Sequence, residues 1–208
     1  MDLNTQSYNR IADQWDEYRR RKNVDPLIEE FAMMLPAGAS VLDIGCGTGY
    51  PIDWYLCSKG FAVTGIDPAE RMLEKAVAME LPGAKFFHTD LFAFETSERF
   101  DAAVAFDSLF HIPLERQKDI YGKVAGLLKP GALFLFSHGK QTGSVSGTMF
   151  GQPFASSALD GDVLKTCLFE AGFELVRFQE NYAHPVTGTR DLIVIAKAAD
   201  PGSTREEE

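Results

Sequence analysis

The sequence has few cysteines and no long apolar run, and each absence excludes a class of protein. Its three cysteines, Cys46, Cys57 and Cys167, form no Cys-x-x-Cys pair, so neither a disulfide framework nor a metal site is expected. No apolar stretch approaches the ~20 residues that a membrane-spanning helix requires. The N-terminus lacks the basic and apolar run of a signal peptide. We therefore expect a soluble, cytoplasmic protein with no membrane partner.

Positive charge is also scarce. Asp and Glu number 30 against 20 Lys and Arg, which gives a formal net charge of −10. Such a chain repels phosphate backbones, so nucleic acid is not expected as a substrate or partner. The 45% hydrophobic content over 208 residues is typical of one globular domain with a sizeable core. We assign residues 1–197 to this domain and predict a disordered, acidic tail at 198–208.

Strand and helix patterns alternate along the chain. Apolar residues at helical spacing predict an N-terminal helical cap within residues 1–36. Strands are expected at 41–44, 62–66, 85–88, 102–106, 132–137, 173–180 and 192–197. Helices are expected at 51–59, 69–79, 120–128 and 160–171, the third closed by Pro130-Gly131.

This alternation predicts an α/β fold, a Rossmann-like three-layer sandwich around a mostly parallel sheet. The last two strands have no helix between them and are separated only by a loop around residues 181–190. They should therefore pair antiparallel, which places one reversed strand near an edge of the sheet.

A glycine-rich turn follows the first strand, in the segment Val41-Leu42-Asp43-Ile44-Gly45-Cys46-Gly47-Thr48-Gly49. Ligands of open parallel sheets bind at the carboxyl ends of the strands, and glycines let the backbone approach them closely. The dinucleotide fingerprint would place its third glycine at position 50, which is Tyr50. Asp43 disfavours a negatively charged pyrophosphate and suits a ligand with a positive charge.

With the landmarks that follow it, this turn resembles the first signature of class I S-adenosylmethionine-dependent methyltransferases of the small-molecule type. Acidic residues end the second and third strands at Asp67 and Asp90. The segment from Phe100 to Asp107 reads Phe-Asp-x-x-x-x-x-Asp, and Leu127-Leu128-Lys129-Pro130-Gly131 precedes the fifth strand. The resemblance covers residues 8–197 and implies a seven-stranded sheet whose last strand is antiparallel.

The resemblance implies S-adenosyl-L-methionine as the cofactor, and direct displacement of its methyl group by a small acceptor. It implies that Asp67 accepts hydrogen bonds from the two ribose hydroxyls. It also implies that Asp90 accepts one from the adenine amino group, while the Leu91 N–H reaches a ring nitrogen. The other residues expected at the cofactor are Tyr8, Asp43, Gly45, Cys46, Gly47, Gly49, Pro68 and Phe106.

Several of these residues also have a structural interpretation. Asp67 followed by Pro68 could simply begin a helix, and Asp43 could be a buried carboxylate that ties the glycine turn. Arg19 could pair with the cofactor carboxylate or belong to a solvated run of three arginines.

Two histidines are candidate catalytic bases. His111 follows the fourth strand and His138 follows the fifth, and a histidine can accept a proton near pH 7. Either could instead be structural.

Residues 138–159 are rich in glycine and serine and are predicted to form an irregular lid loop. Met149, Phe150 and Phe154 within it favour a small, partly apolar acceptor. His184 and Arg190, on the last hairpin, are further candidates for the same wall. The motifs are common to enzymes that methylate oxygen, nitrogen, sulfur or carbon.

Three other functions are compatible with parts of the sequence. An NAD(P)-dependent Rossmann oxidoreductase shares the sheet and the acid after the second strand, but Tyr50 and Asp43 disfavour it. A protein that binds S-adenosylmethionine without turnover would carry the same motifs. A methyltransferase that modifies a macromolecule is disfavoured by the acidic charge and by the lack of an added recognition domain.

Overall fold

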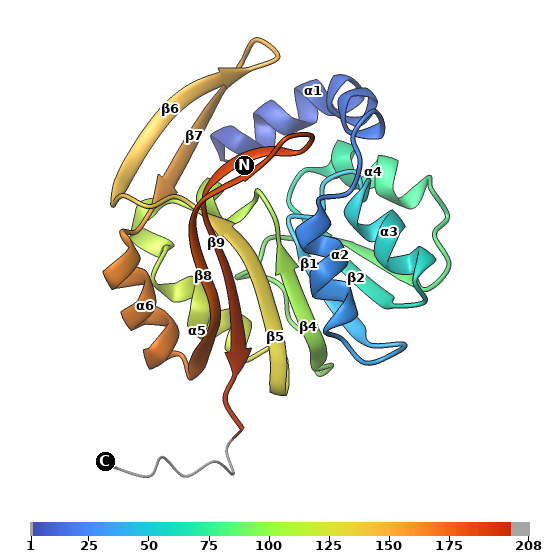
Figure 1. The fold of residues 1–208 in the computed structure, drawn as a ribbon. Coiled ribbons are helices and arrows are strands. Elements are labelled where there is room, and N and C mark those ends of the chain that lie inside the picture. The colour runs from blue at the N-terminus through green and yellow to red at the C-terminus, as the bar shows by residue number, and fades with distance from the viewer. Residues whose placement is uncertain (1, 201–208) are drawn as a thin grey trace, which may run out of the picture.

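The computed structural model describes residues 2–200, which form a seven-stranded sheet with helices on both faces and a separate hairpin (Figure 1). The order of the strands is β3-β2-β1-β4-β5-β9-β8. Their bounds are Ser40–Ile44 (β1), Ala62–Asp67 (β2), Ala84–His88 (β3), Phe100–Ala105 (β4), Leu128–His138 (β5), Phe173–His184 (β8) and Gly188–Ala198 (β9). β1 to β5 pair in parallel, whereas β9 runs antiparallel to both β5 and β8. The predicted fold class, with its reversed strand near an edge, is confirmed.

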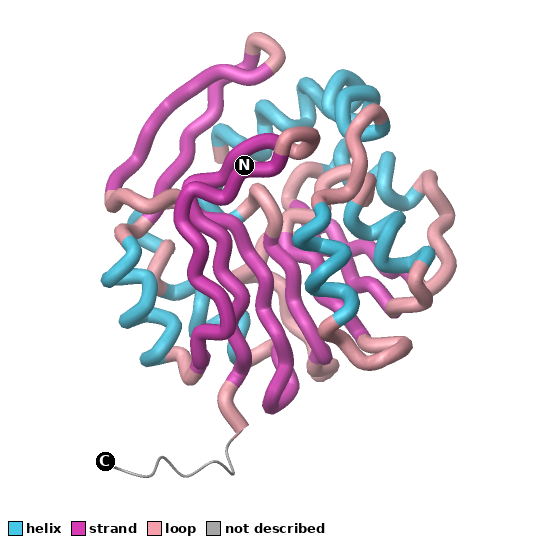
Figure 2. Tube along the Cα trace, in the orientation of Figure 1, coloured by secondary structure: helices cyan, strands magenta, loops and turns pink. Residues whose placement is uncertain are grey.

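Helices cover the two faces of this sheet, as Figure 2 shows in cyan. They are α1 (Leu3–Arg20), α2 (Pro26–Met33), α3 (Ile52–Ser58), α4 (Glu70–Val77), α5 (Asp119–Ala125) and α6 (Gly161–Glu170), with short 3₁₀ turns at Leu109–His111 and Leu114–Arg116. Val41 of β1 packs with α2 and α3, while Leu42 packs with α5 and α6 on the opposite face. This alternation follows from the period of two along a strand. No helix within residues 2–200 is long and apolar enough to cross a membrane.

The order of the strands reverses between β1 and β4, because the chain builds outward from β1 to β3 and then returns to add β4 on the other side of β1. In sheets of this kind the carboxyl ends of the strands at the reversal leave a crevice for ligands. Helix α1 passes over this edge of the sheet (Figure 1).

One helix boundary predicted from the sequence is wrong. Leu127 and Leu128 were expected in a helix closed by Pro130-Gly131, but α5 ends at Ala125 and Leu128 opens β5. Leu128 pairs with Phe100, and the next pair is Leu133 with Ala102. The residues between these pairs bulge out of the ladder, which accommodates a proline that has no N–H to donate.

The irregular loop predicted at 138–159 is also wrong, because the segment forms a hairpin. β6 (Gly143–Met149) and β7 (Gln152–Ala158) pair antiparallel as a separate two-stranded sheet that stands clear of the main one (Figure 1). Phe150 and Gly151 form its turn, with φ of 49° and 75°. Two positive φ angles are typical of a tight hairpin turn.

The last hairpin is longer than predicted. β8 extends to His184 and β9 starts at Gly188, so the loop expected around 181–190 is reduced to three residues. Of the predicted tail at 198–208, Ala198 instead belongs to β9 and pairs with Phe173. Residues 201–208 of that prediction lie outside the described residues.

Candidate active site

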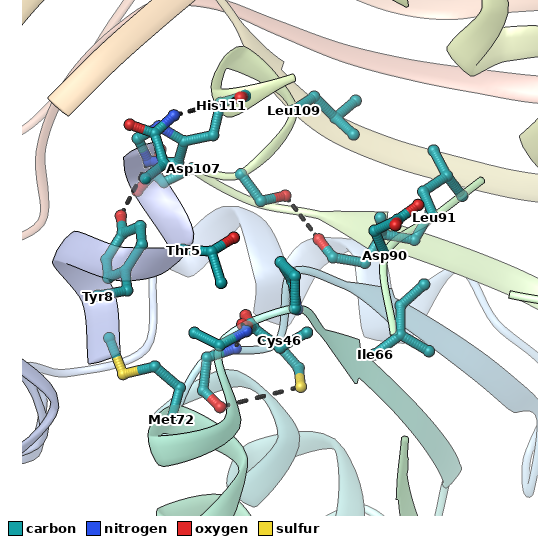
Figure 3. A pocket seen from close by; sticks show the side chains of 18 of the residues that line it. Thr5, Tyr8, Cys46, Ile66, Met72, Asp90, Leu91, Asp107, Leu109 and His111 are labelled. Atoms are coloured by element: carbon teal, nitrogen blue, oxygen red, sulfur yellow. Dashed lines mark hydrogen bonds between the residues drawn. The ribbon is translucent and has the colours of Figure 1, made fainter. Parts of the chain in front are cut away.

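A cavity of about 340 Å³ lies at the carboxyl ends of the strands, beneath α1 (Figure 3). The glycine turn forms the floor of this cavity. Gly45 has a φ of 79° and packs against Ser108 in the segment after β4. A Cβ on Gly45 would lie 2.4 Å from Cβ of Ser108. The Ser108 hydroxyl also donates a hydrogen bond of 2.6 Å to the carbonyl of Ile44. The turn and the end of β4 are therefore held together at the point where the sheet reverses.

Most of the residues predicted from the sequence line this cavity. They are Tyr8, Asp43, Gly45, Cys46, Gly47, Asp67, Pro68, Asp90, Leu91, Phe106 and His111. Gly49 does not line it. A Cβ on Gly49 would lie 2.7 Å from Cε of Met79 and 3.3 Å from Oδ2 of Asp53, so Gly49 serves packing between α3 and α4.

Asp67 ties the glycine turn to the loop after β2. Its Oδ2 accepts a hydrogen bond of 2.9 Å from the N–H of Gly47, and its Oδ1 accepts one of 2.8 Å from Ala69. Ala69, and not Asp67, is the N-cap of α4, so the interpretation of Asp67-Pro68 as a helix start is wrong. Burial raises the pKa of Asp67 to about 6. Each carboxylate oxygen retains a lone pair that can accept a further hydrogen bond.

A second buried carboxyl group in the lining of the cavity is that of Asp43, which has Asp53 as a neighbour. Burial raises the pKa of Asp43 to about 6, although a hydrogen bond from Asp53 opposes this shift. Burial and the neighbouring Asp43 raise the pKa of Asp53 well above its ordinary value. The shift toward the protonated form is larger for Asp53, because Asp43 disfavours its ionisation. Sequence reasoning missed Asp53, whose one signal is its position in the first turn of the helix after the glycines.

Asp90 closes a turn after β3. Its Oδ1 accepts hydrogen bonds from Phe92 N at 2.8 Å and from Ala93 N at 3.0 Å. The turn interpretation is correct, and it also places Asp90 and Leu91 at the wall of the cavity.

Tyr8 and His111 meet above the cavity, where α1 faces the segment after β4 (Figure 3). The Tyr8 hydroxyl lies 2.9 Å from His111 Nε2, and His111 Nδ1 lies 3.2 Å from the carbonyl oxygen of Ala155 in β7. A carbonyl only accepts, so Nδ1 carries the proton and Nε2 accepts from Tyr8. Burial lowers the pKa of His111, which favours this neutral form.

His138 does not line the first cavity. It lines a second cavity of about 980 Å³ between the β6–β7 hairpin and the start of β9. Its Nδ1 lies 2.6 Å from the carbonyl of Gly139, and its Nε2 lies 3.2 Å from Oε1 of Gln117. Both ring nitrogens are engaged, which supports a structural role. His184 lines neither cavity and accepts hydrogen bonds from the backbone of its own turn.

Arg190 holds Asp107 in place at the end of β4. Its Nε and one terminal nitrogen donate to the two oxygens of Asp107, both at 2.8 Å. Its other terminal nitrogen donates to Asp25, the N-cap of α2, at 3.1 Å. Asp107 has a φ of 60°, uncommon for a residue with a side chain, and the bidentate pair fixes it in that conformation.

Polar residues of α1 attach this helix to the β6–β7 hairpin. Nδ2 of Asn4 donates to the carbonyl of Ala155 at 2.9 Å, and Oδ1 of Asn4 accepts from the Ala155 N–H at 2.9 Å. The Ser7 hydroxyl donates to the carbonyl of Pro153 at 2.6 Å. Sequence reasoning missed both residues. They are polar, yet with Ile11 they lie on one buried face of the helix.

The charges around the first cavity are unequal. Arg19 and Arg116 are the lysine or arginine residues in its lining, whereas the aspartates there are Asp2, Asp43, Asp67, Asp90 and Asp107. An excess of carboxylates favours a cationic ligand over a phosphate-bearing one. Within residues 2–200, no group of three or more His, Cys, Asp or Glu side chains is arranged to hold a metal ion.

Comparison with known proteins agrees with this geometry. A family model described as a methyltransferase domain matches residues 41–131, from the glycine turn to the start of β5. A solved S-adenosylmethionine-dependent methyltransferase from Methanosarcina mazei has a TM-score of 0.68 and 25% identity, and the match covers 85% of this chain and 99% of that one. The chain is therefore similar to S-adenosylmethionine-dependent methyltransferases, in sequence over residues 41–131 and in fold over 85% of its length.

The curated proteins that this chain resembles are longer than it is. Squalene methyltransferase 1 from Botryococcus braunii is 35% identical over 111 residues, which cover 49% of this chain and 28% of that protein. A ubiquinone biosynthesis O-methyltransferase from Chromobacterium violaceum is 28% identical over 149 residues, covering 65% of this chain and 62% of that protein. The chain thus spans less than two thirds of either relative.

Proposed function

We propose that this chain transfers the methyl group of S-adenosylmethionine to a small-molecule acceptor. The observation that carries the proposal is the set of aspartates at the strand ends, which line a cavity at the point where the sheet reverses. S-adenosylmethionine has a sulfonium and an ammonium group, and carboxylates stabilise both. The pyrophosphate of a nicotinamide cofactor would be repelled by the same residues, which disfavours the oxidoreductase alternative.

The proposed orientation of the cofactor follows the lining of the cavity. Asp90 and Leu91 would contact the adenine, and Asp67 would accept from the ribose hydroxyls. The methionine end would lie over the glycine turn, near the carboxylate of Asp43. Arg19 suits the cofactor carboxylate, because within residues 2–200 its guanidinium forms no ion pair and donates only a long 3.4 Å hydrogen bond to the carbonyl of Tyr50.

The protein's contribution to the reaction would be alignment and exclusion of water. The sulfonium supplies an activated methyl group, so the acceptor needs only to be held in line with it. Such orientation can lower a barrier by roughly 7–11 kcal/mol. We propose that α1, in the cap of residues 1–36, and the β6–β7 hairpin close over the reacting atoms, which gives the segment 138–159 the role of a lid.

The acceptor class is supported by two kinds of observation. The relatives described above are named for squalene and for ubiquinone biosynthesis, which are both small molecules. The net charge of −10 opposes a nucleic acid substrate. A cytoplasmic location and a single domain over residues 1–197 stay predictions.

Calorimetry with S-adenosylmethionine, S-adenosylhomocysteine and NADPH tests the cofactor. We expect heat of binding with the first two and none with the third. Asp67→Ala should weaken S-adenosylhomocysteine binding by about tenfold or more, because hydrogen bonds to a charged group contribute ~1.5–3 kcal/mol. Asp162→Ala, at a carboxylate that is 96% exposed on α6, is the matched control. Binding of NADPH alone would overturn the proposal.

Turnover distinguishes an enzyme from a protein that only binds the cofactor. Purified protein incubated with methyl-labelled cofactor and a metabolite extract should give labelled small molecules by mass spectrometry. Cofactor binding without any labelled product would favour the binding-only alternative.

A further inference from the structure

The second cavity adjoins the first, and its walls come from five parts of the chain. They are α1, the segment after β4, the end of β5 with the residues that follow it, the β6–β7 hairpin and the start of β9. Trp15, Arg19 and Asp107 line both cavities, so these three residues lie where the two cavities adjoin. A volume of about 980 Å³ is at the upper end of the range for small-molecule sites.

The charge in this cavity is opposite in sign to that in the first. Arg190 and Asp107 are paired with each other, which leaves Arg19, Lys140 and the exposed Asp191 as the other charged lysine, arginine, aspartate or glutamate side chains of the lining. Within residues 2–200 neither Arg19 nor Lys140 has a carboxylate within ion-pair distance. Lys140 donates to the amide oxygen of Asn181 instead. Arg19 faces the cofactor carboxylate in the proposed orientation, so Lys140 is the cation of this lining that is left for a second anionic group.

One wall of the second cavity is aromatic. The Phe150 ring at the hairpin turn lies 6.5 Å from the Trp15 ring and 6.0 Å from the Tyr18 ring, with interplanar angles of 85° and 70°. Phe110 also lines the cavity, and Met149 adds an apolar surface. Phe150 is 43% exposed although it is a large apolar side chain. Such a wall favours a flat, apolar ring.

We propose that the second cavity is the acceptor site, and that it selects a molecule joining an aromatic ring to an anionic group such as a carboxylate, sulfonate or phosphate. The ring packs against the wall that Phe150 forms with the aromatic residues of α1, and Lys140 recognises the anionic group. The acceptor and the methyl group then meet where the two cavities adjoin, at Trp15, Arg19 and Asp107. The role as acceptor site rests on the proposed function, whereas the ligand preference of the cavity does not.

A matched pair of dyes tests this preference. The probes are 8-anilinonaphthalene-1-sulfonate and N-phenyl-1-naphthylamine, which share one ring system and differ by the sulfonate. Lys140→Gln should weaken binding of the sulfonate about tenfold, because a hydrogen bond to a charged group is lost. It should change binding of the neutral dye by less than twofold. Lys85→Gln, on the distant edge strand β3 at a side chain 66% exposed, is the control and should change neither.

Energy transfer shows whether the dye binds beside Trp15, and its loss in Phe150→Ala identifies the second cavity, which alone of the two contains Phe150. Trp54→Phe leaves Trp15 as the sole tryptophan, because the chain has two. In that variant, excitation of Trp15 should give strong transfer to the bound sulfonate dye, and Phe150→Ala should reduce it. Absence of sulfonate binding, absence of transfer from Trp15, or equal losses of both dyes in Lys140→Gln would each overturn the proposal.

The same protein samples separate the two proposals. If S-adenosylhomocysteine binds but Lys140→Gln does not discriminate between the dyes, the acceptor class is wrong and the proposed function stands. If the dyes are discriminated but no labelled methyl group is transferred, the anion preference stands without a role in methylation.

Discussion

The phenolic oxygen of Tyr8 lies 2.9 Å from Nε2 of His111, which joins the N-terminal helix to the segment after β4. Because Nδ1 of the same ring faces a carbonyl oxygen, Nε2 is the nitrogen able to accept a proton, and Tyr8 occupies it. A proton released by an acceptor would therefore reach His111 through the Tyr8 hydroxyl, or after that hydroxyl has moved.

Tyr8→Phe should separate a role of the Tyr8 hydroxyl in proton transfer from a role of the ring in packing. The substitution removes the hydroxyl and keeps the ring between Trp15 and Phe154. We expect the free energy of unfolding to fall by about 1 kcal/mol, and methyl transfer to slow more than cofactor affinity falls. Urea denaturation and initial rates at saturating cofactor measure the two effects. Tyr55→Phe, on α3 at a ring that lines neither cavity, is the control. Wild-type turnover in Tyr8→Phe would exclude the relay.

Cofactor affinity should increase with pH through the titration of Asp67. Its pKa is raised to about 6 in the folded protein, above the ordinary value of 3.8. The native state therefore binds more protons than the unfolded state between these values, so the ligand-free protein loses stability as pH rises through this window. The ribose hydroxyls and the sulfonium of S-adenosylmethionine interact more favourably with the ionised form of Asp67 than with its protonated form. From pH 5 to pH 7 the ionised fraction of Asp67 increases from about 9% to about 91%, so its contribution alone should raise the affinity about tenfold.

Calorimetry with S-adenosylmethionine at pH 5 and pH 7 measures this dependence. Asp67→Asn should flatten it in part, with Asp43 retaining the rest, because the pKa of Asp43 is also raised to about 6. An affinity that is the same at both pH values would contradict the assignment of Asp67.

Gly45→Ala should abolish cofactor binding, and a matched glycine shows why. Gly45 and Gly38 have φ angles of 79° and 70°, so alanine is strained at both positions. A Cβ at Gly45 would also lie 2.4 Å from Cβ of Ser108, whereas one at Gly38 would meet nothing within 4 Å. Gly38→Ala should therefore cost only about 1–2 kcal/mol of stability and leave affinity unchanged. Equal losses in both variants would show that backbone strain alone explains the effect.

Arg190→Ala should be among the most destabilising substitutions on the last hairpin. Removing this guanidinium leaves the Asp25 side chain, which is 3% exposed, without its cation. Breaking a buried pair in this way costs about 3–5 kcal/mol. Arg177, on the same hairpin, pairs with Glu30 of α2, but these side chains are 40% and 52% exposed. Arg177→Ala should cost about 0–1 kcal/mol. Urea denaturation of both variants checks the contrast, and similar midpoints would refute it.

The sequence predicted the sheet and the cavity floor because both depend on local patterns. The apolar run before Gly45 and the acids after the next two strands, Asp67 and Asp90, occupy positions that any parallel sheet brings to one edge. These residues line the cavity as expected. Their roles toward the cofactor stay predictions.

Long-range polar contacts were not predictable. Asn4 and Ser7 carry no apolar signal, yet they bind the backbone of β7 about 150 residues away. β6 and β7 consist largely of Gly, Ser, Ala and Thr, so their alternation is weak and the segment resembles a loop. The sequence makes His138 a candidate base by residue type alone, and its contacts with Gln117 and Gly139 could not be read from the sequence.

The surplus of aspartates around the first cavity also bears on how the reaction cycle would end. In the proposed reaction the donor enters with a sulfonium and leaves as an uncharged thioether. Carboxylates that attract the incoming donor, Asp43 foremost among them, lose that attraction once the methyl group has gone. The spent nucleoside is then held less strongly than the fresh one, so the transfer step itself would promote product release.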